Sequence, residues 1–249
     1  MLPIDAAAHG SRWRRRHPVD KAVLGLGLTA LAVALPPWPG APLVLVSALA
    51  LLLGPAGVPW RRLWRAYRVP WGFCLTGAVT LLFEVGGPDG PVGLAEGGPV
   101  RAGELLLRTS AASLGVLLFA FTTPMSDLLP RLVRARVPAP VVDVALVTYR
   151  MGFLLLDSLH RIRQAQAARL GHASRAAEWR SLAGLGATAF VRAFARASRL
   201  QDGLAGRGYD GTLRVLVPEA RVSVPFTVAS VALLVVVAAL TGVLVEVGA

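Results

Sequence analysis

The sequence has little cysteine, little lysine and few acidic side chains. Cys74 is the only cysteine in 249 residues, so the chain itself cannot form a disulfide framework, a cysteine metal site or a CxxC redox pair. Lys21 is the only lysine, and it lies outside any glycine-rich loop, which excludes a Walker-type nucleotide site. Charged residues make up 16 % of the chain, against about 25 % in a soluble domain. The chain therefore has too few polar side chains to cover a soluble surface of its size.

Apolar side chains and arginine are abundant instead. Apolar residues make up 55 % of the chain, and the formal net charge of +12 comes almost entirely from arginine. The mean hydropathy is +0.59. A strongly basic chain binds either nucleic acid or an anionic membrane face. Because the arginines lie beside apolar stretches of spanning length, we predict an all-α, polytopic protein of the cell membrane. Its surroundings are the lipid bilayer, and we expect no nucleic-acid partner.

Five apolar stretches come close to the roughly 20 residues that cross about 30 Å of hydrocarbon. They comprise residues 22–35, 41–58, 69–85, 105–121 and 222–247. No small-x-small cleavage site follows the first stretch, so we expect it to stay in the protein as a start-transfer helix. Its Gly25-Leu26-Gly27 segment fits helix packing better than nucleotide binding. Arg108, near one end of the fourth stretch, is expected to extend to the interface. We predict about five transmembrane helices.

Charges in the connections predict the orientation of these helices. The N-terminal segment is strongly basic, which keeps it on the cytoplasmic side. Residues 60–68 alternate arginine with tryptophan and tyrosine, as is typical of the inner membrane boundary. The next connection carries Glu84, Asp89 and Glu96 among glycines and prolines, and it predicts an irregular outer loop. We therefore divide the chain into a membrane region (1–121), a cytoplasmic region (122–221) and a C-terminal transmembrane helix (222–249).

The predicted cytoplasmic region contains two amphipathic helices. It carries 15 arginines and 7 acidic residues, a net charge of +8. The first helix has an apolar stripe at intervals of three and four residues, formed by Val144, Val147, Met151, Leu154, Leu155, Leu159 and Ile162. The second runs from about Glu178 to Leu204 beside a basic stripe of Arg192, Arg196 and Arg199. Such helices lie on the lipid surface, extend the membrane helices as a solvated bundle, or dock onto a soluble partner, and the pattern leaves these alternatives open.

Each amphipathic helix ends in a similar signature. Residues 164–171 place Arg169 after small residues and close to Gly171, and residues 201–211 place Arg207 between Gly206 and Gly208. Glycine allows the chain to turn with positive φ at a helix C-terminus. The arginine then projects as a fixed fork of donors that can meet a carboxylate or helix-end carbonyl groups. Two such ends on two neighbouring helices suggest paired arms.

The sequence resembles the T component of energy-coupling-factor transporters, in its cobalt-type form known as CbiQ. The features that carry the resemblance occur in order along nearly the whole chain: Ile4-Asp5, His17-Pro18-Val19-Asp20-Lys21, Thr122-Thr123-Pro124, Val137-Pro138, Tyr149-Arg150, Ala168-Arg169 and Gly206-Arg207-Gly208. In that family the arginine motifs end coupling helices that fit grooves on two ATP-binding-cassette ATPases. The resemblance implies a transporter of two ATPases, this scaffold and a separate substrate-binding membrane subunit. It also implies that this chain couples motion and performs no chemistry.

The resemblance assigns the ATPase-coupling residues one by one. They are Ala168, Arg169 and Gly171 in the first motif, and Gly206, Arg207 and Gly208 in the second. The family pattern is Ala-Arg-Gly. The first motif departs from it by placing Leu170 before the glycine, and the second has Gly206 in the alanine position.

Metal binding and catalysis find little support in the sequence. The histidines are His9, His17, His160 and His172, and they lack the spacing of a ligand set. We therefore expect no metal site, no cofactor and no catalytic residue in this chain. The cargo implied by the resemblance is cobalt or nickel. A T component that serves a vitamin transporter is the alternative within the family. A membrane-embedded lipid or polyprenyl transferase is the alternative of another class.

Overall fold

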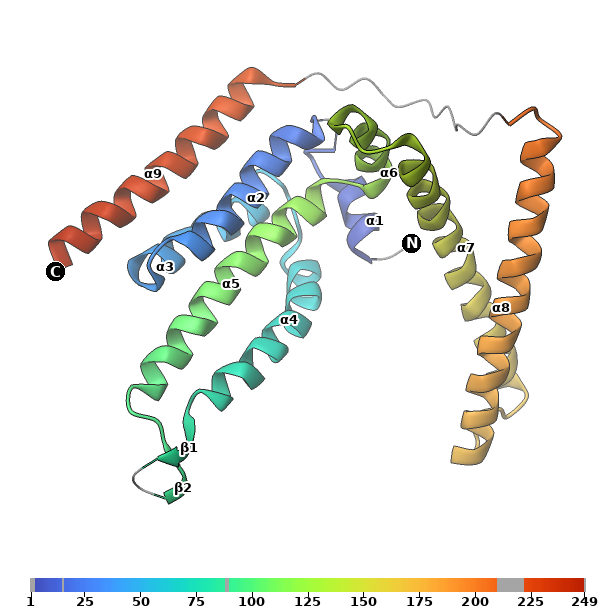
Figure 1. Ribbon diagram of the computed structural model, residues 1–249, viewed down its shortest axis with the longest axis horizontal. Helices are drawn as coiled ribbons and strands as arrows, with labels where there is room; N and C mark the ends of the chain where they lie inside the picture. The colour runs from blue at the N-terminus through green and yellow to red at the C-terminus, as the bar shows by residue number, and fades with distance from the viewer. Residues whose placement is uncertain (1–2, 15, 88–89, 210–221, 249) are drawn as a thin grey trace. The chain divides into compact units, whose positions relative to one another are not determined.

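The computed structural model describes residues 3–14, 16–87, 90–209 and 222–248 of the chain (Figure 1). These residues are almost entirely helical, which confirms the predicted all-α class. They divide into two compact units. The first, called here the membrane unit, comprises Met1–Met125 and Pro218–Ala249, and the second, called the hairpin unit, comprises Ser126–Val217. Each unit is described separately below.

The membrane unit is built around a long central helix. Its helices are α1 (Pro3–Gly10), α2 (Pro18–Ala34), α3 (Pro37–Leu53), α4 (Trp60–Thr80), α5 (Gly98–Thr122) and α9 (Val224–Gly248). The α2, α3 and α4 helices pack on α5, and α9 packs on α2 and α3. The core between them is lined by fully buried aliphatic and aromatic side chains that include Leu28, Val44, Leu52, Leu118 and Phe121.

Glycine lets α2 and α5 approach each other closely. A Cβ added to Gly25 would lie 3.1 Å from the carbonyl oxygen of Gly115, and a Cβ added to Gly115 would lie 3.0 Å from that of Gly25. Small residues at a helix crossing allow backbone-to-backbone packing, which membrane helices use where apolar burial gives no driving force. The helix-packing explanation of Gly25 is therefore confirmed.

The α4 helix and the segment after it differ from the sequence prediction. Residues 60–68 and the predicted span at 69–85 do not form separate segments, because one helix runs from Trp60 to Thr80. Trp60, Trp64 and Trp71 continue a single helical periodicity across the predicted boundary, and their rings lie within van der Waals range of one another or of Tyr67. Pro70 lies inside this helix, near the predicted boundary, and the helix continues through it.

The predicted irregular outer loop contains a β-hairpin, so that prediction is wrong in part. Strands β1 (Phe83–Gly87) and β2 (Gly90–Leu94) pair antiparallel, with Phe83 opposite Leu94. Backbone pairing satisfies amide groups that would otherwise need water. Asp89 of the predicted loop lies outside the described residues.

Among the described residues, three helices are long and apolar enough to cross a membrane. They are α5, α7 (Ala139–Ala168) and α9, whose qualifying part is Val224–Val247; α3 is a shorter apolar helix. The predicted first span lies in α2, which has 17 residues. The α7 helix meets the criterion although it belongs to the predicted cytoplasmic region. The chain is thus a multi-pass helical protein, and five remains the predicted number of spans.

The hairpin unit consists of two long helices preceded by short turns. A single turn α6 (Met125–Leu128) and the 3-10 segment η1 (Leu129–Ala135) lead into α7, and a short connection joins α7 to α8 (Arg175–Ala205). Both predicted amphipathic helices are confirmed. The Ser174 hydroxyl caps α8 by accepting a hydrogen bond from Ala177 N at 3.2 Å. The two helices run antiparallel, and Arg192 Nη1 donates to Ser158 Oγ at 3.1 Å between them.

Much of the apolar surface of the hairpin unit is uncovered. No residue of α8 is buried, and α7 buries only Val142 and Ser158 among its described side chains. Phe190 and Phe194 are 71 % and 68 % exposed, and Val144 is 67 % exposed. Such a thin core leaves two apolar stripes for lipid or another protein to cover.

Candidate functional site

The α7 helix ends in a hydrogen-bonded turn of the Schellman type. Gly171 N donates to Gln166 O at 2.8 Å, and Leu170 N donates to Ala167 O at 3.1 Å. Leu170 is left-handed, with φ 55°. Arg169 is exposed and immediately precedes this left-handed residue. The turn fixes the backbone that carries the arginine, because the two bonds satisfy two of the terminal carbonyl groups of the helix.

The α8 helix ends in the same turn. Tyr209 N donates to Leu204 O at 3.1 Å, and Gly208 N donates to Ala205 O at 3.1 Å. Gly208 takes the left-handed position with φ 70°. Arg207 is exposed and precedes it, as Arg169 precedes Leu170. The two arginines therefore occupy equivalent backbone positions. Asp210 and Gly211 of the second signature lie outside the described residues.

Gly171 does not supply the left-handed turn that the signature suggested, and its role in ATPase coupling stays a prediction. The chain turns at Leu170, whereas Gly171 serves a close approach to α8. A Cβ on Gly171 would lie 2.6 Å from Ser181 Oγ and 2.8 Å from Gln166 O. Ser181 Oγ donates to Gly171 O at 2.8 Å, and Gln166 Nε2 donates to Ser181 O at 2.8 Å. These two hydrogen bonds thus fix the first arginine motif against the N-terminal part of α8.

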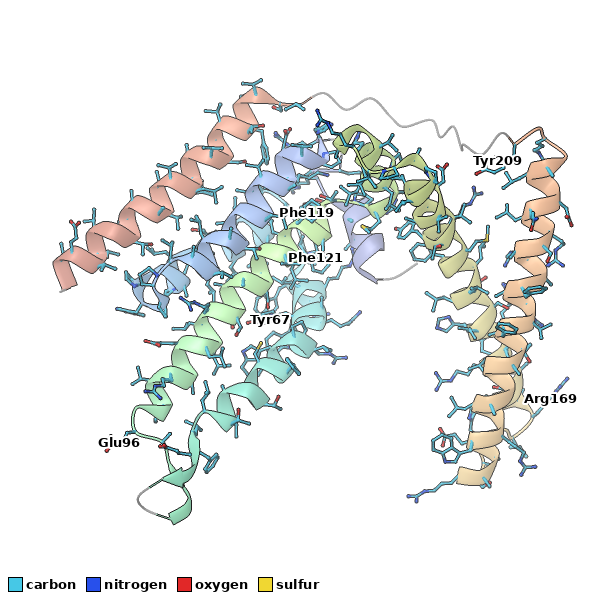
Figure 2. All side chains as sticks on the ribbon, in the orientation of Figure 1. Tyr67, Glu96, Phe119, Phe121, Arg169 and Tyr209 are labelled. Atoms are coloured by element: carbon cyan, nitrogen blue, oxygen red, sulfur yellow. The ribbon has the colours of Figure 1, made fainter. Side chains whose placement is uncertain are left out.

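The two arginine-bearing ends lie at opposite ends of the α7–α8 hairpin. Figure 2 labels Arg169 at one end and Tyr209, two residues after Arg207, at the other. Because Gly171 lies against Ser181, residues 181–205 of α8 separate them, which corresponds to about 36 Å at a rise of about 1.5 Å per residue. A single small binding site cannot contact both arginines.

Each arginine end presents one exposed apolar side chain as well. Leu170 is 75 % exposed, and Tyr209 is 42 % exposed. Arg207 Nη1 donates to Gly203 O of its own helix at 3.0 Å, which orients the guanidinium along the helix end. Residues 168 and 206, the small residues of the two motifs, are also exposed. The surface offered at each end is therefore a cation beside an apolar group.

Two clefts lie along the hairpin, one near each arginine. The larger, of about 550 Å³, is mainly apolar and is lined by residues that include Val144, Val147, Leu200, Leu204 and Tyr209. The smaller, of about 340 Å³, is lined by His160, Arg163, Gln164, Ala167, His172 and Glu178. Within the described part of the chain, no three His, Cys, Asp or Glu side chains come together in a way that would hold a metal ion.

Two other motifs of the resemblance, residues 17–21 and 122–124, come together in the membrane unit. His17 Nδ1 accepts a hydrogen bond from Val19 N at 3.2 Å and so caps α2. Asp20 and Lys21, in the first turn of α2, are buried, and Thr122 to Pro124 at the end of α5 are buried beside them. Lys21 Nζ donates to Thr122 O at 2.7 Å. Sequence spacing gave no sign of this contact, because 101 residues separate its partners.

These observations define the class: a multi-pass helical membrane protein with an antiparallel pair of long helices, each ending in an exposed arginine turn. The model of the family described as "Cobalt transport protein", CbiQ, matches residues 10–219. The cobalt transport protein CbiQ of Rhodobacter capsulatus is 46 % identical over 217 residues, 87 % of this chain and 88 % of that protein. The CbiQ of Salmonella typhimurium is 32 % identical over 224 residues, 85 % of this chain and 98 % of that protein. The chain belongs to the CbiQ family.

Family membership confirms the resemblance to the T component of energy-coupling-factor transporters. It also decides between the two classes of function that the sequence left open. The chain is a non-catalytic transmembrane component of a transporter, which excludes the alternative of a lipid or polyprenyl transferase.

Proposed function

We propose that this chain couples two ATPases to a substrate-binding membrane subunit in an uptake transporter for cobalt or nickel ions. In this proposal the arginine end of α7 docks on one ATPase and the arginine end of α8 docks on the other. The observation that carries the proposal is the equivalence of the two ends: the same hydrogen-bonded turn places an exposed arginine directly before the left-handed residue in both.

The chemistry of each end suits a rigid mechanical contact. A guanidinium offers five N–H donors in a planar fork, which matches a carboxylate or a pair of carbonyl groups on a partner. The backbone below Arg169 and Arg207 is held by two turn hydrogen bonds, so little conformational freedom is lost on docking. The neighbouring Leu170 and Tyr209 add apolar contact. When an ATPase displaces such an end, the helix that carries the end moves with it.

The distance between the ends supports two ATPase subunits rather than one. Two equivalent sites about 36 Å apart fit the two equivalent surfaces of a symmetric dimer of ATPases, one at each end. The net charge of +8 on residues 122–221 favours partner grooves lined by acidic side chains.

The orientation belongs to the same proposal: the N-terminus and residues 122–221 face the cytoplasm. The hydropathy of α7 does not oppose this, because α7 is packed along α8. Three arginines, Arg192, Arg196 and Arg199, lie within α8, and Arg192 is bonded to Ser158 of α7. Placing α7 across the bilayer would carry these charges into hydrocarbon at a cost of about 2.5 kcal/mol or more each.

Cargo recognition is proposed for a separate membrane subunit. The family description and both named relatives refer to cobalt, which favours a metal ion over the vitamin alternative. Cobalt and nickel ions prefer similar nitrogen and oxygen ligands. A coupling scaffold that never contacts the ion does not distinguish between them. Uptake of radiolabelled cobalt and nickel, with the ATPase and the substrate subunit co-expressed, identifies the cargo.

Removing both arginines tests the docking. The double variant Arg169→Ala/Arg207→Ala is expected to lose the ATPases during purification and to lose uptake. The matched control is Arg161→Ala/Arg199→Ala, which removes one exposed arginine from within α7 and one from within α8 and is expected to retain both the ATPases and the uptake. A docking double variant that co-purifies with ATPases and transports normally contradicts the proposal.

A further inference from the structure

The membrane unit holds both chain segments that lead to and from the hairpin unit. Among the described residues, the chain leaves the membrane unit after Met125 and belongs to it again from residue 222. The last residues of α5 and the first turn of α9 therefore flank the two crossings. Consecutive residues at the start of α2 contact one of these segments each.

Asp20 holds the returning segment. Its carboxylate accepts a hydrogen bond from Ser223 N at 3.0 Å and another from Thr227 Oγ1 at 3.1 Å. Ser223 immediately precedes α9, so Asp20 bonds to the start of that helix from 203 residues away in sequence. Asp20 has no exposed surface. A carboxylate at a helix N-terminus also interacts favourably with the helix dipole.

Lys21 holds the departing segment. Its ammonium group donates to the carbonyl oxygen of Thr122 at 2.7 Å, at the C-terminal end of α5. Lys21 is 2 % exposed, and Thr122 is fully buried. A cation at a helix C-terminus is favourable for the same electrostatic reason, with the sign reversed. These three bonds thus place an acid at the start of one helix and a base at the end of another.

We propose that Asp20 and Lys21 form a coupling junction: they are positioning residues that fix both connections of the hairpin unit to one rigid helix. This rests on the proposed coupling function. Motion of the docked hairpin reaches the membrane helices along its two connections. If these connections can slide along α2, the displacement is lost in them. When both connections are fixed to α2, the displacement moves α2 and, through the Gly25–Gly115 crossing, also α5.

Stability alone does not explain the choice of these residues. Two buried charges carry a large desolvation cost, and apolar side chains of similar volume often pack such a site equally well or better. Apolar packing is non-directional, however, and would leave the positions of Ser223 and Thr122 along α2 unspecified. Directional bonds to the first turn of α9 and the last turn of α5 specify one position for each.

The test uses small substitutions in the complete transporter complex. Thr227→Val removes the hydroxyl that bonds to Asp20 and keeps the shape of the side chain. Thr241→Val is the matched control in the same helix, because Thr241 is buried and its hydroxyl bonds only within α9, to Val237 O at 2.8 Å. Lys21→Met removes the donor to Thr122, and Lys21→Arg restores a donor.

Three quantities are measured on each reconstituted complex: ATPase subunits per chain, ATP hydrolysis rate, and metal ions taken up per ATP hydrolysed. We expect Thr227→Val and Lys21→Met to keep both ATPases and to hydrolyse ATP, but to lower uptake per ATP by about tenfold, as the loss of a hydrogen bond to a charged group implies. Thr241→Val is expected to match the wild type, and Lys21→Arg to recover most of the coupling.

The outcomes separate the two proposals. Loss of the ATPases from the wild-type complex refutes the proposed function. If Thr227→Val and Lys21→Met take up as many metal ions per ATP as the wild type, the junction is refuted and the docking proposal stands. An equal fall in Thr241→Val, or no recovery in Lys21→Arg, also refutes the junction, because the effect is then general destabilisation. Should Lys21→Met fail to accumulate, Thr227→Val decides alone.

Discussion

The substitution Gly171→Ala probes how the first arginine motif is locked to α8. The added Cβ would lie 2.6 Å from Ser181 Oγ and 2.8 Å from Gln166 O, where an ordinary contact is at least 3.4 Å. Gln166 O cannot move away, because it accepts the turn hydrogen bond from Gly171 N. Ser181 must therefore swing aside and lose its bond to Gly171 O. Lost bonding of about 1 kcal/mol and overpacking of about 1–2 kcal/mol give a total of about 2–3 kcal/mol.

Hydrogen exchange of the full-length protein in lipid nanodiscs measures this cost locally. Amides around the α7–α8 connection are expected to exchange about 30- to 140-fold faster in Gly171→Ala, since each 1.4 kcal/mol is tenfold. The control is Gly186→Ala in α8, where an added Cβ meets nothing within 4 Å. Alanine raises helix stability there by up to about 1 kcal/mol, so exchange should slow. Unchanged exchange in Gly171→Ala would refute the close-approach explanation of this glycine.

Three further predictions follow from the other glycines and from the topology. Gly208→Ala places a side chain at φ 70° and should destabilise the turn by about 1–2 kcal/mol. The expected result is weaker binding of the ATPase at the α8 end. The control Gly206→Ala, at φ −67°, should bind the ATPase normally. Gly115→Ala should separate α2 from α5 and lower the melting temperature by several degrees, as about 1–3 kcal/mol of overpacking implies; an unchanged melting temperature contradicts the contact. In a Cys74→Ala background, Leu170→Cys should label with impermeant thiol reagents only from the cytoplasmic side, and a cysteine in the β1–β2 hairpin only from outside; the reverse pattern contradicts the orientation.

Apolar periodicity and the placement of charges predicted much of the fold, because both patterns involve residues that are close together in sequence. Val144 and its successors at three- and four-residue intervals indicated α7, and the second stripe indicated α8 within about three residues of its observed Arg175–Ala205 limits. The start of α4 was not predicted, because arginines between Trp60 and Tyr67 suggested a boundary where the backbone continues as helix. The β-hairpin was missed because glycine and proline in that segment give no alternating apolar pattern.

The candidate site was predicted in its residues but not in its geometry. Arg169 and Arg207 could be found because an arginine among small residues at a helix end is a local pattern. The turn at Leu170 could not, since leucine is disfavoured at positive φ and only the surrounding contacts hold it there. The bonds of Asp20 to the start of α9 could not be predicted from the sequence for a different reason. More than 200 residues separate the partners, and no local pattern predicts such a pair.

Subunit stoichiometry tests the central claim most directly. The complex of this chain with its ATPases is purified in mild detergent and weighed by native mass spectrometry. Two equivalent arginine ends predict two ATPase subunits in the wild type. Because ATPases can also bind one another, the measurement is made in the nucleotide-free state with a dimerisation-deficient ATPase. Arg169→Ala and Arg207→Ala should then each retain one ATPase, and the double variant none. Two ATPases bound to the double variant would contradict the account.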